Sequence, residues 1–334
     1  MPKRSPAEQL NQAIEEVLVA LPSRSESKSG RSLAQVMSIA RTLRFLPRAS
    51  FRAALKSDLQ RRTAMSESTA ASPAPAPPHF RRPGFPNIAP YFLVNHAPQF
   101  IDFLVSAFEG TERIRVPRPD GSVMHAEVGI GNSVIEMGDA NQQYPQRFMT
   151  THLYVPDARA TYARALKAGA TPIFSPTDEH PSGDLWGEAK DPFGNTWYIA
   201  TRKGWSGGPE GVLTVQPYLH LRNAHDMIPF IEAAFSAKVT GVHKSPDGIV
   251  QHATIEIAGA TFEIDEAQGE TQPTQSYLHV YVPDTDAVYA QALRAGATSV
   301  TPPNTAPYGD RAATVKDPFD NTWFLATFVG EPHP

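Results

Sequence analysis

Hydrophobic residues recur with two different periods along most of the chain after residue 86. Segments such as VMHAEVGI (123–130) alternate at every second residue and predict half-buried strands, whereas segments such as APQFIDFLVSAF (97–108) repeat every three or four residues and predict helices. Between residues 86 and 203 the predicted order is one strand, one helix and three strands, and then the same order again. The pattern therefore predicts an α+β domain made of two βαβββ units.

The whole succession then occurs a second time. The phrase KDPFGNTWYIAT at 190–201 returns as KDPFDNTWFLAT at 316–327 with nine of twelve residues identical, and an offset of 127 or 126 residues aligns the two halves for more than 100 residues. A register kept over that length indicates duplication of a domain with its own core. We therefore predict two tandem domains, 86–203 and 212–329, which form a pseudo-dimer within a monomeric chain.

The chain begins with a different kind of segment. Residues 1–66 contain three helical hydrophobic patterns, and residues 67–85 form a Pro/Ala-rich stretch typical of a semi-extended linker. Residues 1–65 carry twelve Lys and Arg against five Asp and Glu, which is +7 and leaves −11 for the remainder of a chain whose total is −4. We interpret 1–66 as a basic helical segment that docks on the acidic body or is solvated. We expect no nucleic-acid binding, because neither an aromatic platform nor a base-reading motif accompanies the charge.

Composition limits the remaining classes. The 334 residues are 41% hydrophobic, which suits a globular protein, and no run of about 18 apolar residues suggests a membrane span. The start of the chain has no apolar segment typical of a secretory signal. The absence of cysteine removes thiol chemistry, disulfides and thiolate metal sites. We therefore expect a cytoplasmic protein that does not bind membranes.

Several linked motifs resemble those of the vicinal oxygen chelate superfamily, which includes glyoxalase I, bleomycin-resistance proteins and extradiol dioxygenases. They are PYFLV, AFEG, DGSVMHAEVGIGNS, YVPD and DPFGN in the first repeat, and PYLHL, YVPD, ALRAGA and DPFDN in the second. The sequence is most similar to the PhnB-like subgroup, and the resemblance covers 86–203 and 212–329. It implies paired βαβββ units whose curved sheets enclose a cavity, and it leaves the function open.

The resemblance also bears on metal binding. Metal-using members of the superfamily place His, Gln or Glu at four points, on the first, fourth, fifth and last strands around the cavity. The matching residues are Ala89, Glu136, Thr150 and Tyr198 in the first domain, and Gln216, Glu263, Tyr277 and Phe324 in the second. Sets crossed between the domains supply at most two ligands, Gln216 and Glu263, which is fewer than the three protein ligands of a typical catalytic metal. We therefore expect no standard metal site and no cofactor.

The period-two pattern places other polar residues toward the cavities. In 123–130, Met124, Ala126, Val128 and Ile130 face the apolar side, so His125 and Glu127 face the other. With Gln216 included, the predicted ligand-binding residues are Tyr91, His125, Glu136, His152, Gln216, Tyr218, His220, His252, Glu263 and His279. Such a set suits a polar small organic molecule, with His as a proton shuttle, although no catalytic residue can be assigned.

Structural roles compete with some of these assignments. His125 and His252 fit equally well as hydrogen-bonding residues that maintain the fold. Trp197 and Trp323 lie on the apolar side, so we predict core positions for them and a structural role for the DPF turns. Glu136 and Glu263 are more informative, because a carboxylate between apolar neighbours needs a partner or cavity water.

The sequence thus favours a small-molecule-binding protein, with two alternatives. One is a metal-dependent lyase, isomerase or dioxygenase that uses non-standard ligands, namely Gln216, His220, Glu263 and His279. The other is a regulatory or interaction protein that acts through the basic N-terminal helices.

We predict the working cavity in the second domain, where the first domain's Ala89, Leu93 and Gly138 are replaced by polar residues. The second-domain set is Gln216, Tyr218, His220, His252, Glu263, Asp265 and His279.

Overall fold

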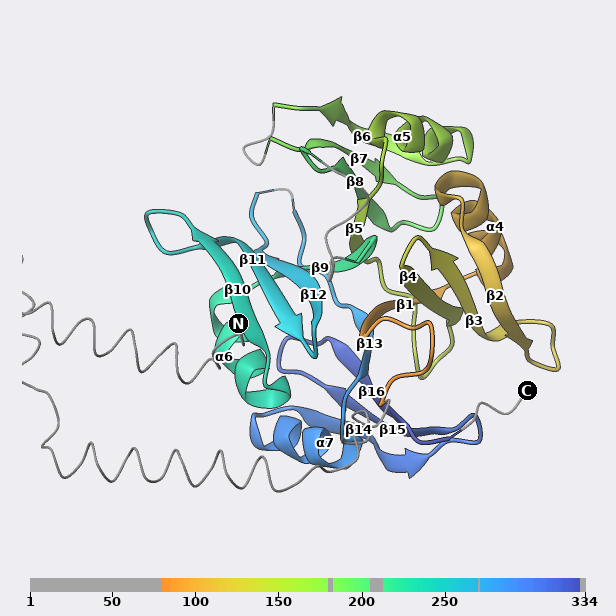
Figure 1. Cartoon of the computed structure of the whole chain (residues 1–334), viewed down its shortest axis with the longest axis vertical. Helices are drawn as coiled ribbons and strands as arrows, with labels where there is room; N and C mark the ends of the chain where they lie inside the picture. The colour runs from red at the N-terminus through yellow and green to blue at the C-terminus, as the bar shows by residue number, and fades with distance from the viewer. Residues whose placement is uncertain (1–79, 180–182, 205–212, 270, 331–334) are drawn as a thin grey trace, which may run out of the picture. The chain divides into compact units, whose positions relative to one another are not determined.

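A computed structural model describes residues 80–179, 183–204, 213–269 and 271–330 (Figure 1). The predicted basic segment 1–66, and the predicted linker as far as residue 79, lie outside these residues. No helix within the described ranges is long and apolar enough to cross a membrane.

Four βαβββ units follow one another along the described chain. The first contains β1 (Ile88–Val94), α4 (Ala97–Phe108), β2 (Thr111–Pro117), β3 (Val123–Ile130) and β4 (Ser133–Asp139). The second contains β5 (Thr150–Tyr154), α5 (Ala158–Lys167), β6 (Thr171–Thr177), β7 (Leu185–Lys190) and β8 (Thr196–Thr201). The third contains β9 (Val215–Leu221), α6 (Ala224–Phe235), β10 (Lys238–Lys244), β11 (Val250–Ile257) and β12 (Ala260–Glu266). The fourth contains β13 (Tyr277–Tyr281), α7 (Thr285–Arg294), β14 (Thr298–Thr305), β15 (Asp310–Lys316) and β16 (Thr322–Phe328). The predicted α+β fold of tandem paired units is confirmed.

The strands of the two repeats are exchanged between two sheets. One eight-stranded sheet has the order β14-β15-β16-β13-β1-β4-β3-β2, and the other has the order β10-β11-β12-β9-β5-β8-β7-β6. Antiparallel pairing of β1 with β13 joins the first and fourth units, and pairing of β5 with β9 joins the second and third. We call them the β1/β13 sheet and the β5/β9 sheet. The expectation that each domain has a cavity of its own is therefore wrong, because both sheets draw half of their strands from each repeat.

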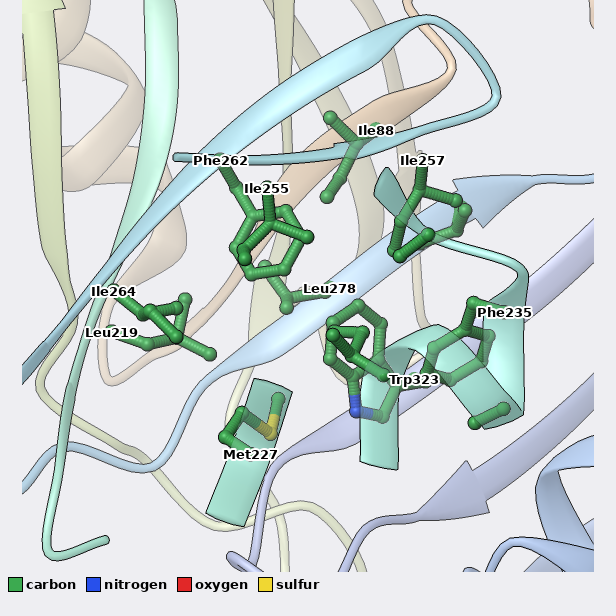
Figure 2. Close-up of a cluster of buried hydrophobic side chains, with 14 of the residues drawn as sticks. Ile88, Leu219, Met227, Phe235, Ile255, Ile257, Phe262, Ile264, Leu278 and Trp323 are labelled. Atoms are coloured by element: carbon green, nitrogen blue, oxygen red, sulfur yellow. The ribbon is translucent and has the colours of Figure 1, made fainter. Parts of the chain in front are cut away.

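The hydrophobic cores, by contrast, follow the repeats. One core contains residues of α4 and α5 together with residues of β1, β3, β4, β5, β7 and β8, and it includes Val215 of β9. The other contains residues of α6, α7, β9, β11, β12, β13, β15 and β16, including Phe235, Phe262 and Trp323, together with Ile88 of β1 (Figure 2). Each repeat thus buries its own helices while it shares its strands. The core positions predicted for Trp197 and Trp323 are confirmed, since both are 0% exposed.

The repeated DPF phrase forms a turn around a buried aspartate. Asp191 accepts hydrogen bonds from the backbone N–H groups of Phe193 and Asn195, from Asn195 Nδ2 and from Trp197 Nε1, at 2.8 to 2.9 Å. Asp317 accepts the equivalent four bonds in the second repeat, including one of 2.8 Å from Trp323 Nε1. The turn therefore fixes the tryptophan that fills each core, which supports the structural interpretation of the phrase.

Candidate functional site

Alternation along the strands separates core residues from a polar face on each sheet. In β3, Ala126 and Val128 are fully buried in the core, whereas His125 and Glu127 hydrogen-bond to each other on the opposite side. In β11, Ala253 and Ile255 are fully buried, while His252 is directed toward Glu263 of β12. The period-two argument thus placed these side chains on the correct face, but it was wrong for Met124, which was predicted on the apolar side and is 51% exposed.

Glu263 is the centre of the polar face of the β5/β9 sheet. Its side chain is 4% exposed, and its Oε2 lies 2.8 Å from Nδ1 of His152 in β5. The hydroxyl of Tyr154 donates to Oε1 at 3.2 Å, and His252 Nε2 lies 3.8 Å from the same oxygen. The third unit therefore supplies the carboxylate, and both repeats supply its partners.

The electrostatics of this group favour an ionised glutamate. Burial opposes the ionisation of Glu263, but the charge and hydrogen bond of His152 and the nearby charge of His252 outweigh it and hold the pKa of the carboxyl well below its usual range. The Glu263 carboxylate, whose Oε1 lies 3.8 Å from His252 Nε2, raises the pKa of this imidazole above its ordinary value of 6.5. Nε2 of His152 is buried without a hydrogen-bond partner among the described residues. This nitrogen therefore has hydrogen-bonding capacity that the described residues do not use.

A second hydrogen-bonded chain lies next to Glu263. Asp265 Oδ1 is 2.6 Å from His220 Nδ1, and the hydroxyl of Tyr218 donates to Oδ2 at 3.3 Å. The other ring nitrogen of His220, Nε2, lies 3.2 Å from the hydroxyl of Tyr198. If Nδ1 donates to Asp265, Nε2 accepts from Tyr198, so the carboxylate fixes the tautomer of the buried imidazole.

Two further residues complete this face, and the sequence analysis missed both. Glu188 of β7 is half-buried opposite Tyr198, and burial raises the pKa of its carboxyl. Trp186 of the same strand lies edge-to-face with Tyr198, with ring centroids 5.7 Å apart. Because Ala189 is buried in the core, the alternation in β7 carried the signal that Trp186 and Glu188 face the other way.

The β1/β13 sheet has a related but different polar face. Glu136 of β4 pairs with His279 Nδ1 of β13, as Glu263 pairs with His152. Burial disfavours both charges, but their mutual attraction prevails: the pKa of Glu136 is lowered and that of His279 is raised. Tyr91 OH lies 3.1 Å from His125 Nδ1, and His125 Nε2 lies 3.2 Å from Glu127 Oε1.

These contacts divide the predicted site residues into two groups. The β1/β13 sheet holds Tyr91, His125, Glu136 and His279, and the β5/β9 sheet holds His152, Gln216, Tyr218, His220, His252 and Glu263. Assigning His279 to the cavity of the other second-domain residues was therefore wrong, because β13 pairs with β1. Gln216 is buried and its Oε1 accepts a 3.0 Å hydrogen bond from Thr261 Oγ1.

The same division separates the non-standard metal ligands considered above. His279 lies in a different sheet from Gln216, His220 and Glu263, so the four residues are not brought together. Within the described ranges, no group of three or more His, Asp or Glu is arranged to hold a metal ion.

Comparison with known proteins agrees with this architecture. Residues 84–199 match the family model described as Glyoxalase/Bleomycin resistance protein/Dioxygenase superfamily. Uncharacterized proteins of Mycobacterium bovis and Mycobacterium tuberculosis (strain H37Rv) are each 37% identical over an alignment of 125 residues, and the match covers 34% of this chain and 82% and 73% of those proteins. The chain belongs to the glyoxalase/bleomycin resistance/dioxygenase superfamily.

Solved structures show the same fold over both repeats. Glyoxalase I from Zea mays superposes with a TM-score of 0.58 and 16% sequence identity, covering 71% of this chain and 90% of that protein. A mutant form of the maize enzyme gives a TM-score of 0.56 at 15% identity, covering 72% of this chain and 94% of that protein. At these identities the likeness describes the fold alone.

Proposed function

We propose that this chain binds a small organic molecule on the polar face of the β5/β9 sheet, without the standard metal of the superfamily. The observation that carries the proposal is the buried Glu263–His152 pair, which leaves His152 Nε2 without a partner among the described residues. An imidazole held by a carboxylate on one side is well placed to accept a proton or hydrogen bond from a ligand on the other.

The neighbouring groups support a polar ligand with a ring. Tyr198 lies edge-to-face with both Trp186 and Tyr218, with centroids 5.7 and 5.4 Å apart. Glu188 adds a half-buried carboxyl beside these rings, for which no hydrogen bond is found within the described residues. Aromatic walls with a few directed polar groups are typical of small-molecule sites.

Two surface pockets can be compared with the position of the proposed site on the β5/β9 sheet. A pocket of about 270 Å³ is lined by His220, by the loop residues Pro273 to Gln275 and by Pro318 to Asp320 of the second DPF turn, but not by His152 or Glu263. A larger hollow of about 630 Å³ is more open and lies near β2 and β3, away from both Glu–His pairs. We favour the smaller one, because His220 links it to Asp265 and Tyr198.

The proposal is tested by a thermal-shift screen of small organic molecules, since a ligand that binds the native state stabilises it by RT ln(1 + [L]/Kd). Compounds that raise the Tm are then titrated against wild type, Glu263→Gln and His152→Ala. Leaving a buried polar partner unmatched costs about 1–3 kcal/mol, so both variants should bind roughly 5- to 150-fold more weakly.

Glu136→Gln is the matched control, because it makes the same change in the other sheet. It should leave the affinity within about twofold of wild type, since it is not part of the proposed site. A decisive effect of Glu136→Gln together with silent changes at Glu263 and His152 would move the site to the β1/β13 sheet.

A further inference from the structure

Residues 80–87 form a tight turn against the β1/β13 sheet. The backbone N–H of Phe85 donates to the carbonyl of Arg82 at 3.1 Å, and Gly84 has φ 75°. Proline at the second position and a positive-φ glycine at the third are typical of a type II turn. The turn is fixed at both ends, because Phe80 O accepts from Phe328 N and Asn87 O accepts from Tyr281 N, each at 2.8 Å.

This turn places the side chain of Arg82 among the polar groups of the sheet. Its guanidinium forms an ion pair with Glu127, whose side chain is 4% exposed, and its Cζ lies 3.8 Å from the centroid of the Phe85 ring. The Arg82 charge also interacts with the buried residues Glu136 and His279. The guanidinium therefore lies between a carboxylate and an aromatic ring, in the way that proteins recognise planar cations.

The face retains acceptor capacity that Arg82 does not use. Asp310 is 2% exposed; its Oδ2 accepts a 2.9 Å hydrogen bond from Tyr281, but its Oδ1 is buried without a partner among the described residues. Burial raises the pKa of this carboxyl, and the charges of His279 and Arg82 act in the opposite direction. Three buried carboxyl groups, those of Glu127, Glu136 and Asp310, thus share this face with the Arg82 guanidinium and with His279.

We propose that the polar face of the β1/β13 sheet is a second binding site, for a guanidinium or amidinium group of a small molecule, and that the chain's own Arg82 occupies it. The chemical class follows from the occupant: a flat cation with several N–H donors that pairs with Glu127 and lies against Phe85. This proposal is independent of the function proposed above, because it concerns the other sheet.

Arg82 competes with a free ligand for this site from a fixed position, because the turn at 82–85 holds it there. A group attached by a short segment competes at an effective concentration in the millimolar range. Wild-type protein should therefore respond weakly to free guanidinium at low millimolar concentration. Removing the Arg82 side chain should open the site.

The test is chemical rescue of Arg82→Ala with guanidinium chloride at concentrations far below those that denature, against sodium chloride at equal ionic strength. At about five times its dissociation constant a ligand raises the Tm of a domain of 150–250 residues by about 2–4 °C. We expect such a rise for Arg82→Ala and not for Arg82→Ala/Glu127→Gln. Arg82→Met retains the apolar stem over Phe85 and serves as a second variant if Arg82→Ala does not fold.

Arg113→Ala is the matched control. Arg113 also lies over the Phe85 ring, at 5.0 Å, but its hydrogen bond goes to the carbonyl of Gly84. Guanidinium should not raise the Tm of this variant. Two outcomes would overturn the proposal and show that Arg82 makes only a structural ion pair. One is that guanidinium chloride and sodium chloride change the Tm of Arg82→Ala and of Arg82→Met equally. The other is that guanidinium raises the Tm of Arg113→Ala as much as that of Arg82→Ala.

Discussion

The exchange of strands between the repeats predicts that the first repeat cannot fold stably as a monomer. A fragment of residues 80–204 keeps the α4 and α5 core but loses the third and fourth units. Strand β1 then lacks its pairing with β13, from Ile88–Val280 to Pro90–Leu278, and β5 lacks its pairing with β9. Two central strands become exposed edges, which are ready to pair with another chain.

The cost for the monomeric fragment follows from the buried ion pairs. Glu136 is 4% exposed and loses His279, and removing one partner of a buried pair costs about 3–5 kcal/mol. Native domains are stable by only about 5–15 kcal/mol in total. With both edges open as well, we expect little stability to remain.

A second copy of the fragment can restore what is lost. The two repeats align His152 with His279 and Glu136 with Glu263, so β5 of one copy can pair with β1 of the other and bring its His152 to Glu136. We therefore expect a symmetric dimer of the fragment and, for residues 80–330, a monomer. The mycobacterial relatives are about one repeat long, because the 125 matched residues make up 82% of one of them.

Size-exclusion chromatography with light scattering and thermal melts at several concentrations test this expectation. The fragment should be dimeric with a Tm that rises with protein concentration, whereas the Tm of residues 80–330 should not change with concentration. His152→Ala should dissociate the fragment, because His152 serves both sites of the dimer. A monomeric fragment whose Tm is independent of concentration and close to that of residues 80–330 would refute the reasoning.

Three further predictions concern metal, pH and the aspartate turn. Protein purified without added metal should contain well under one equivalent of transition metal by elemental analysis, and stoichiometric metal that is lost on Glu263→Gln would favour the metal-dependent alternative. The raised pKa of His279 beside Glu136 stabilises the fold fully below the ordinary value of 6.5 and less as the pH rises through the folded-state value, so ΔG of unfolding should decline above pH 6.5. This decline should be smaller in His279→Gln, and equal slopes would contradict it. Asp317→Ala leaves Trp323 Nε1 and other buried donors unmatched and should cost about 3–5 kcal/mol in urea unfolding, whereas a loss below about 1 kcal/mol would argue against a structural turn.

Local patterns were sufficient to predict the order of the helices and strands and the face on which His125 and Glu127 lie. The alternation of apolar residues in β3 distinguished Val128 from His125, because a strand turns successive side chains to opposite sides whatever it pairs with. The buried tryptophans followed from the same parity. These features depend on neighbours within a few residues, and the sequence records them directly.

The pairing of the units could not be predicted in this way. Strands β5 (TTHLY) and β13 (YLHVY) both carry a central histidine followed by an apolar residue and a tyrosine, so β1 can pair with either by local pattern alone. The position of His279 depends on this choice. Arg82 was missed for a similar reason, since it lies in a segment with the composition of a linker and meets Glu127 only through the fold.

The two polar faces share one part and differ in another. Both retain a buried Glu–His pair, formed by Glu136 with His279 and by Glu263 with His152. In the hydrogen-bonded chain of the β5/β9 sheet, Tyr218 corresponds to Tyr91, whereas His220, Asp265 and Tyr198 correspond to Leu93, Gly138 and Phe324. Leu93 and Gly138 are register partners, as are His220 and Asp265, and a Cβ at Gly138 would lie 2.7 Å from the carbonyl oxygen of Met124. Losing one member of such a chain would leave buried polar groups unmatched, whereas losing all three avoids that cost. The Glu–His pair is therefore the part common to both sheets, and the His220 chain is the part that gives the β5/β9 sheet a chemistry of its own.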